Sequence, residues 1–350
     1  MKKHIAYIGT YTTDESKGIY KLILDGASSN IKSVKLVAEL DNPTYLAIDK
    51  TNKYLYATIK KGDEGGVAAF SIHPSTGDLT MINHQLSSGS APCHVNLDDN
   101  NKYLFSANYH KGLLEAFPLR EDGSIEAASS SILQTGFGPN KHRQEKAHTH
   151  YVSLTPDQKY LCATDLGTDE LIVSSFENGN LVKSEELSLH LNPGSGPRHI
   201  AFHPNRKYAY ILTELSSEVI TLEYSEATSK FKILQYIAAL PKDFTDESIG
   251  SAIHISPDGK HLYTGNRGHD SISIFKIAPS GLLELVSHMP TGGNHPRDFE
   301  ITPDGNFILA ANMNSNNILC FSVDKNSGML SKQGSEVALP NPVCIKFLNI

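Results

Sequence analysis

The stretch SAIHISPDGKHLYTGNRGHDSISIFKI, residues 251–277, decides the fold. Ile253 and Ile255 alternate with polar neighbours, a Pro-Asp-Gly turn follows at 257–259, and two further apolar runs surround Leu262 and Ile274. Alternation with a period of two, bounded by Pro, Asp and Gly, is typical of short antiparallel strands. The stretch therefore predicts a strand, a tight turn, a second strand, a loop and a third strand.

The same pattern recurs along the chain. The copies are NPTYLAIDKTNKYLYAT, APCHVNLDDNNKYLFSAN, HTHYVSLTPDQKYLCATD, GPRHIAFHPNRKYAYILTE and HPRDFEITPDGNFILAAN. Aligned on the residue that opens the second strand, the six copies fall at Tyr54, Tyr103, Tyr160, Tyr208, His261 and Phe307. The steps between them are 49, 57, 48, 53 and 46 residues. A repeat of about 50 residues with four strands predicts an all-β protein of the β-propeller type.

The two ends of the chain share one further repeat. HIAYIGTY at the N-terminus resembles the second strand of a repeat, and GIYKLIL and SVKLVAEL resemble the third and fourth. NPVCIKF, residues 341–347, matches the missing first strand. One closing blade shared by both termini removes free sheet edges. With six intact copies, we expect a seven-bladed β-propeller of four antiparallel strands per blade, forming a single domain over 1–350.

Composition narrows the class of partner. The formal net charge of −7 argues against nucleic acid, which calls for a basic face. No apolar run reaches the ~18 residues of a membrane span, and no signal peptide precedes the repeats, so we expect a cytoplasmic protein without membrane contact. The four cysteines, Cys93, Cys162, Cys320 and Cys344, form no CxxC pair and are interpreted as buried free thiols. Nothing in the sequence predicts an oligomeric state.

Two registers of loop residues stand out on one face of the predicted propeller. The residue after the proline that opens each first strand, or its equivalent, reads Thr44, Cys93, His150, Arg198, Ser251, Arg297 and Val343. The end of each second strand reads Thr58, Asn108, Asp165, Glu214, Asn266 with Arg267, and Asn312. Charged residues at equivalent places on neighbouring blades indicate a pocket, although Arg and carboxylate side chains there could also pair simply to join blades.

An insertion, FGPNKHRQEKAHTH at 137–150, accounts for the longest step. It is rich in His, Lys and Arg and poor in apolar residues, so we expect a loop. It is either a solvated surface loop or a partial lid over a ligand. At Lys141, His142 and Arg143 it would attract a phosphorylated substrate.

Several pieces together resemble the seven-bladed propeller lactonases, typified by the propeller-type 6-phosphogluconolactonase and including carboxy-muconate cyclase. They are AHTHYVSLTPDQKYLCATDLG, GPRHIAFHPN with AYILTEL, SPDGKHLYTGNRGHDSI and HPRDFEITPDGNFILAANMNSNNI. The resemblance implies a pocket with one His, two Arg and one Glu, which carry over to His150, Arg198, Glu214 and Arg267. Further candidates for substrate binding are His94, Asn108, His148, Asp165, His199 and Arg297. Asp298 departs from the HPRH-like pattern, which bears on substrate identity.

The resemblance implies hydrolysis of a small anionic sugar lactone, with 6-phosphogluconolactone of the pentose phosphate pathway as the first candidate. His150 or Glu214 would activate water, and Arg198 and Arg267 would bind the oxyanion, a carboxylate or a phosphate. No G-x-S-x-G, GxGxxG or P-loop pattern is present, so we expect neither a serine nucleophile nor a nucleotide cofactor. The alternatives are a calcium-dependent lactonase, a muconate-type lactonising enzyme and a non-catalytic scaffold. We expect no metal ion, because two guanidinium groups would repel a cation, and no other cofactor.

Overall fold

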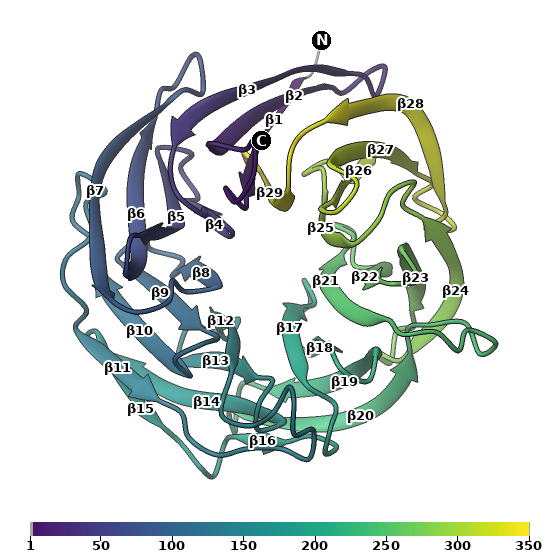
Figure 1. Cartoon of the computed structure of the whole chain (residues 1–350). Coiled ribbons are helices and arrows are strands. Elements are labelled where there is room, and N and C mark those ends of the chain that lie inside the picture. The colour runs from purple at the N-terminus through teal and green to yellow at the C-terminus, as the bar shows by residue number, and fades with distance from the viewer. Residues whose placement is uncertain (1–2, 350) are drawn as a thin grey trace. The chain divides into compact units, whose positions relative to one another are not determined.

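The computed structural model describes residues 3–349, and strands are its only regular elements there (Figure 1). The chain divides into two compact units, and each is described by itself. Unit one comprises Met1–Glu39, His199–Tyr224 and Lys232–Ile350. Unit two comprises Leu40–Arg198 and Ser225–Phe231. The single domain over 1–350 stays a prediction.

Seven antiparallel sheets follow one another along the chain, which confirms the seven-bladed β-propeller. One sheet has the order β29 (Pro342–Phe347), β1 (Lys3–Thr10), β2 (Gly18–Asp25), β3 (Ile31–Glu39). The next two are β4 (Leu46–Ile48), β5 (Tyr54–Lys61), β6 (Glu64–Ile72), β7 (Leu79–Ser88), and β8 (His94–Leu97), β9 (Tyr103–Asn108), β10 (Leu113–Pro118), β11 (Ser130–Leu133).

The fourth sheet contains β12 (Thr149–Leu154), β13 (Tyr160–Asp165), β14 (Glu170–Glu177), β15 (Asn180–Lys183) and β16 (Leu189–His190). The last three are β17 (Pro197–Phe202), β18 (Tyr208–Thr213), β19 (Glu218–Ser225), β20 (Lys230–Ala238); β21 (Ile249–Ile255), β22 (His261–Arg267), β23 (Ser271–Ile277), β24 (Leu283–Pro290); and β25 (Pro296–Ile301), β26 (Phe307–Asn312), β27 (Asn317–Val323), β28 (Leu330–Ala338).

The strand shared by the two termini pairs as predicted. Within unit one, β29 runs antiparallel to β1, with Ala6 opposite Phe347 and Ile8 opposite Ile345. Ile345 is fully buried and Phe347 nearly so, in a cluster that also holds Leu309 from the neighbouring sheet. The last strand of the chain therefore belongs to the first blade, and its side chains join two sheets.

The tight turns have a shared hydrogen-bonding pattern that explains their sequence. In unit one, Ser256 Oγ donates to Asp258 at 2.7 Å, and Asp258 in turn accepts the backbone N–H of Lys260 at 3.2 Å. Gly259 has φ +73°, a conformation that glycine adopts without steric cost. Thr302 donates to Asp304 in the same way at 2.8 Å. A Ser or Thr before Pro-Asp-Gly therefore closes the turn between first and second strands.

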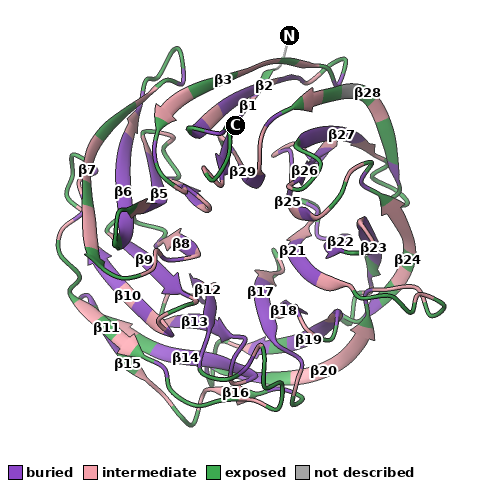
Figure 2. Cartoon of the chain, in the orientation of Figure 1, coloured by how far each residue is buried: buried purple, intermediate pink, exposed green. Residues whose placement is uncertain are grey.

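The core of each unit lies between the faces of its sheets. In unit two, Phe105 and Leu114 of one sheet pack against Val152, Ala163 and Ile172 of the next. Second and third strands are mostly buried, whereas the outer strands β3, β7, β24 and β28 carry intermediate and exposed residues (Figure 2). None of the described residues forms a helix long and apolar enough to cross a membrane. All four cysteines are free thiols.

Candidate active site

The residue that opens each first strand occupies a β-bulge in several sheets. In unit two, Thr149 lies opposite Asp165 and Tyr151 opposite Thr164, so the ladder skips His150. In unit one, Pro296 lies opposite Asn312 and Asp298 opposite Ala311, so that ladder skips Arg297. A bulge leaves one residue outside the pairing and redirects its side chain. The register found in the sequence therefore corresponds to a backbone irregularity that frees a side chain from the strand alternation.

His150 is buried in unit two beside aromatic and sulfur groups. Its ring meets Tyr109 edge to face with centroids 5.8 Å apart, and its backbone carbonyl lies 3.3 Å from Cys93 Sγ. Its side chain is about 5% exposed. Arg198, the last residue of the longer segment of unit two, is also buried, and its carbonyl accepts a 2.6 Å hydrogen bond from Thr164 Oγ1. Both residues therefore have their backbones fixed by the sheet.

His94 and His148 are held by neighbours within unit two. His94 is sandwiched between Tyr45 and Tyr151, each with a ring centroid 4.1 Å away. His148 stacks on Tyr109 at 4.2 Å, and its Nδ1 lies 2.9 Å from the Tyr109 carbonyl. Its Nε2 lies 3.1 Å from Glu145. The contacts of His148 anchor the inserted loop to the sheet.

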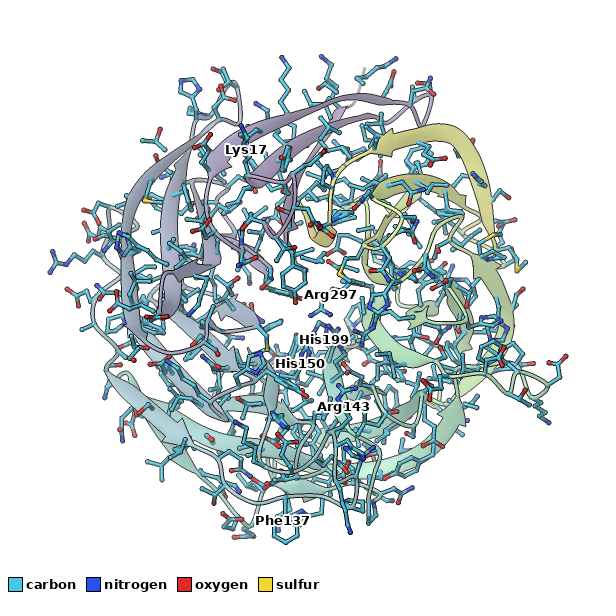
Figure 3. The ribbon with its side chains drawn as sticks, viewed as in Figure 1. Lys17, Phe137, Arg143, His150, His199 and Arg297 are labelled. Carbon is cyan, nitrogen blue, oxygen red and sulfur yellow. The ribbon has the colours of Figure 1, made fainter. Side chains whose placement is uncertain are left out.

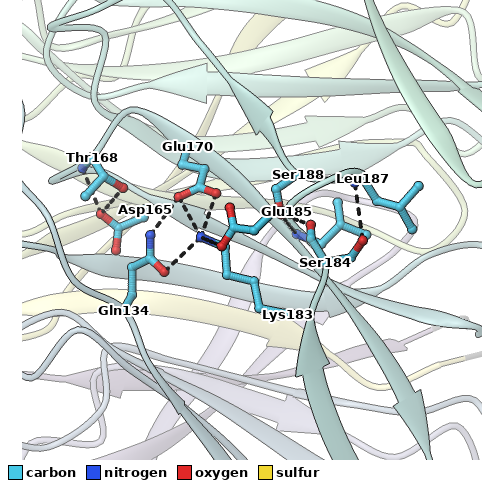
Figure 4. Close-up of polar contacts among 10 residues, drawn as sticks. Gln134, Asp165, Thr168, Glu170, Lys183, Ser184, Glu185, Leu187 and Ser188 are labelled. Atoms are coloured by element: carbon cyan, nitrogen blue, oxygen red, sulfur yellow. Dashed lines mark hydrogen bonds and ion pairs between the residues drawn. The ribbon is translucent and has the colours of Figure 1, made fainter.

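Asn108 and Asp165 shape the turns that follow their strands. Asn108 Nδ2 donates to the Ser90 carbonyl at 2.8 Å, and its Oδ1 accepts the N–H of Lys111. Asp165 Oδ1 accepts both the N–H and the hydroxyl of Thr168, at 2.9 and 3.0 Å (Figure 4). Burial raises the pKa of the Asp165 carboxyl. Each side chain therefore accepts a backbone N–H of the turn that follows its strand, and Asn108 also joins that turn to the segment before β8.

The 137–147 insertion is a loop, as predicted, and it is pinned from within. Gln144 is fully buried, and its Nε2 donates to the Leu166 carbonyl at 2.9 Å. Asn140 Oδ1 accepts the N–H groups of His142 and Arg143, at 3.1 and 3.2 Å. Phe137, by contrast, is 79% exposed (Figure 3). Gln144 therefore holds the loop against its sheet, while Lys141 and His142 are exposed.

Glu214 and Arg267 form a buried ion pair in unit one. Glu214 follows β18 and Arg267 ends β22, so both come from the ends of second strands. Arg267 Nη2 lies 2.8 Å from Glu214 Oε2, with side chains 4% and 5% exposed. The same Nη2 donates to the Gly250 carbonyl, and the Gly250 N–H donates to the Glu214 carbonyl at 3.1 Å. The two side chains are thus oriented by each other and by one backbone segment.

Arg297 and His295 lie beside this pair in unit one, and His295 was not among the sequence candidates. The guanidinium of Arg297 is 5.4 Å from the centroid of the Tyr11 ring. The pKa of His295 is lowered to about 4 by burial first, and then by the charges of Arg267 and Arg297. His199, also of unit one, is buried (Figure 3). The sequence feature that could have identified His295 is its position directly before Pro296 and Arg297 in GGNHPR.

The structure thus brings Glu214 and Arg267 into contact within unit one, and the charges of Arg267 and Arg297 both lower the pKa of His295 there. His94, Asn108, His148, His150, Asp165 and Arg198 belong to unit two. Among residues 3–349, no group of three or more His, Cys, Asp or Glu side chains is arranged to hold a metal ion. Asp298, the departure from the HPRH-like pattern, accepts the N–H of Ile345 at 2.8 Å and joins two first strands of unit one.

Comparison with known proteins identifies the class. Residues 5–347 match the family described as "Lactonase, 7-bladed beta-propeller", and the chain belongs to this family. This membership confirms the expected resemblance and enzyme class, a lactonase. The chain is 47% identical to a 6-phosphogluconolactonase of Bacillus subtilis, over 100% of this chain and 99% of that protein.

Two solved structures share the whole fold. A protein from Lactobacillus plantarum is 34% identical with a TM-score of 0.94, covering 99% of this chain and 100% of that one. A periplasmic gluconolactonase of Pseudomonas aeruginosa is 30% identical with a TM-score of 0.93, covering 100% of both chains. Family membership therefore extends over the full length of the chain.

Proposed function

We propose that this lactonase hydrolyses 6-phosphogluconolactone to 6-phosphogluconate, a step of glucose oxidation in the pentose phosphate pathway. The name of the Bacillus subtilis relative, at 47% identity over the full chain, supports this substrate. In the reaction, water attacks the lactone carbonyl and the ring C–O bond breaks. One water proton passes to a base, and the leaving ring oxygen takes up a proton to become a hydroxyl group.

The buried Glu214–Arg267 pair carries the proposal. Burying an ion pair rarely stabilises a fold more than apolar residues of the same size would. This pair ends two second strands, the register that the sequence had singled out. A guanidinium held in a buried site is suited to bind an oxyanion, because its charge and direction are set before the substrate arrives. We therefore assign oxyanion or carboxylate binding to Arg267 and Arg198.

We assign activation of water to His150, with Glu214 as its orienting group or as the alternative base. His150 sits at a β-bulge, which directs its side chain independently of the strand alternation. An imidazole suits this role because it changes charge near neutral pH. The Glu214 carboxylate is already engaged by the Arg267 guanidinium. For this reason His150 is the first choice.

Metal independence is part of the proposal. The Glu214 carboxylate, the strongest oxygen ligand of its register in unit one, is engaged by Arg267. A cation placed there would have to displace the guanidinium and would be repelled by it. We propose that hydrolysis proceeds with protein groups alone.

The test is a steady-state assay on 6-phosphogluconolactone with the wild type and the His150→Ala variant. We expect kcat to fall about 10²–10⁴-fold in His150→Ala with little change in KM. If His150→Ala keeps near-native turnover and Glu214→Gln loses it, the carboxylate is the base. If the wild type hydrolyses no sugar lactone faster than buffer does, the proposed function is wrong.

The second candidate substrate is an unphosphorylated gluconolactone. The 30% identical Pseudomonas aeruginosa protein, which bears that name, favours it. Comparing kcat/KM for the two lactones separates the candidates. That relative is described as periplasmic, whereas we propose the cytoplasm for this chain, supported by its four free thiols. Cell fractionation with an antibody to the protein tests the compartment.

A further inference from the structure

We propose that Arg297 and His295 form a binding site for a dianionic oxyanion, and that binding there transfers one proton from solvent to His295. The site lies in unit one, where the loop before β25 meets the chain after β1. Resting on the proposed function, we identify the natural anion as the phosphate group of a phosphorylated lactone. The anion site itself is argued from the residues alone.

The first observation is a guanidinium with no carboxylate partner. Among residues 3–349, the Arg297 side chain makes no hydrogen bond or ion pair and lies over the Tyr11 ring, 5.4 Å from its centroid. It is only partly exposed to solvent. A cation held over an aromatic face keeps its donors available, because the contact uses the plane of the guanidinium and not its N–H groups.

The second observation is that the nearby carboxylates are already engaged. Glu214 is paired with Arg267. Asp270, in the turn after β22, accepts the N–H groups of His295 and Gly268 on Oδ1, at 2.8 and 3.2 Å. Its Oδ2 accepts the Asn294 amide at 2.6 Å. Neither carboxylate forms an ion pair with Arg297, so the N–H donors of its guanidinium have no carboxylate acceptor among residues 3–349.

The third observation is the backbone conformation of His295. The residue before the proline is left-handed in four loops of this type: Asn42, Gly196, His295 and Asn341 have φ between +48° and +61°. Glycine and asparagine tolerate this conformation best, and they fill the other three positions. His295 adopts it with its N–H bonded to Asp270 and its carbonyl accepting the N–H of Met313 at 3.0 Å. Histidine enters this region more readily than most residues do, and its two backbone hydrogen bonds hold His295 in this conformation.

The charges around the imidazole determine how it responds to a ligand. Arg267 from β22, Arg297 from β25, Glu214 after β18 and Asp270 face it, and Tyr11 lies under Arg297. Burial first, and then the two cations, whose effects exceed those of the two carboxylates, hold the His295 pKa at about 4, so the ring is neutral near pH 7. A dianion between the two residues would neutralise the cations and raise that pKa. His295 should therefore take up a proton on anion binding when the pH lies between its pKa in the free protein and its higher pKa in the complex.

Linkage then fixes the direction of the pH dependence. Since the complex binds more protons than the free protein, affinity for the anion rises as pH falls through this window, by at most about tenfold per pH unit. Sulfate is the appropriate probe because it keeps its double charge throughout, whereas the second pKa of a phosphate monoester is about 6. Titration calorimetry in two buffers of different ionisation enthalpy measures the proton uptake directly.

Four variants test the assignment by sulfate binding. We expect Arg297→Met to weaken binding about 10- to 100-fold and Arg297→Lys to recover part of it, as expected for loss of a charge-assisted fork. His295→Asn keeps a residue suited to the left-handed position and should remove the proton uptake without loss of folding. Arg120→Met, which deletes an exposed arginine of unit two, is the matched control and should bind as the wild type does.

The outcomes separate this site from the proposed activity. Sulfate binding that is independent of pH in the wild type, or equal in Arg297→Met and Arg120→Met, would overturn the anion site whether or not the protein is a lactonase. If Arg297→Met lowers kcat/KM equally for the phosphorylated and the unphosphorylated lactone, the anion is not the substrate's phosphate. A selective loss for the phosphorylated lactone is the result that we expect.

Discussion

Replacing Glu214 with Gln removes one charge from a buried ion pair and keeps the shape of the side chain. The Oε2 and Nη2 atoms of Glu214 and Arg267 are 2.8 Å apart in a site that is almost closed to solvent. At an effective dielectric constant of about 20, unit charges at this distance attract by about 6 kcal/mol. Losing one partner of a buried pair costs about 3–5 kcal/mol, because the other charge stays buried alone. We expect the free energy of unfolding to fall by about 3 kcal/mol, since the amide oxygen of Gln still accepts a hydrogen bond.

The measurement is urea-induced unfolding of the variant beside a matched control. Arg120 and Glu126 form an ion pair of 2.6 Å in unit two, but their side chains are 67% and 41% exposed. Glu126→Gln should therefore cost less than about 1 kcal/mol, as exposed pairs do. If Glu214→Gln costs no more than Glu126→Gln, the pair does not hold two interacting charges. In that case the reasoning that made Arg267 a preorganised anion binder fails with it.

Three further predictions concern the metal, the shared blade and the inserted loop. Dialysis against a chelator should leave lactone hydrolysis unchanged; activity lost and then restored by calcium would make Glu214 a metal ligand. Deleting residues 341–350 should destabilise the whole of unit one, and Ile345→Ala alone should cost about 2–5 kcal/mol, because its side chain is fully buried. Unchanged thermal unfolding of the truncated chain would contradict the shared blade. Neutralising Lys141 and Arg143 should lower kcat/KM for a phosphorylated lactone and flatten its dependence on ionic strength; an unaltered dependence would leave the loop a structural element.

The blades could be predicted because their cause is local and repeated. Each turn between first and second strands carries its own hydrogen-bonding side chain, as Ser256 and Asp258 show, so the same short pattern marks every copy. The phase of the repeat at the two ends also predicted that β29 pairs with β1. Both features follow from residues close together in the sequence or from the repeat of about 50 residues.

The divided outer strand of the fourth sheet was not predictable in this way. β15 ends at Lys183 and β16 begins at Leu189, and both pair with β14. Between them the Ser188 hydroxyl accepts the Val173 N–H at 3.0 Å, in place of a backbone carbonyl. A serine side chain that replaces a ladder bond has no periodic signal, because serine is common in outer strands and turns alike.

Part of the candidate site was predictable for the same reason as the blades. Aligning the copies singled out four positions, those of His150, Arg297, Glu214 and Arg267. The structure explains why the alignment is informative at His150 and Arg297. Each is the extra residue of a bulge. The alignment did not separate out residues such as Asn108 and Asp165, whose side-chain oxygens accept N–H groups of the turns that follow their strands. Polar character at a shared position does not reveal which atoms the neighbouring backbone already uses.

The bulge also explains how one repeat carries different chemistry in different blades. A residue outside the ladder contributes no cross-strand pairing, so its replacement leaves the hydrogen bonds of the sheet intact. In unit one the bulge position is filled by Arg297 in one blade and by Val343 in another. The ladder resumes at the next residue, Asp298 in the first case and Cys344 in the second. The left-handed position that precedes the proline works in the opposite way, because its backbone conformation restricts which residues fit there. The bulge therefore holds side chains as different as those of Arg297 and Val343, whereas the position before the proline holds Gly, Asn or His, which reach the left-handed conformation more readily than most residues.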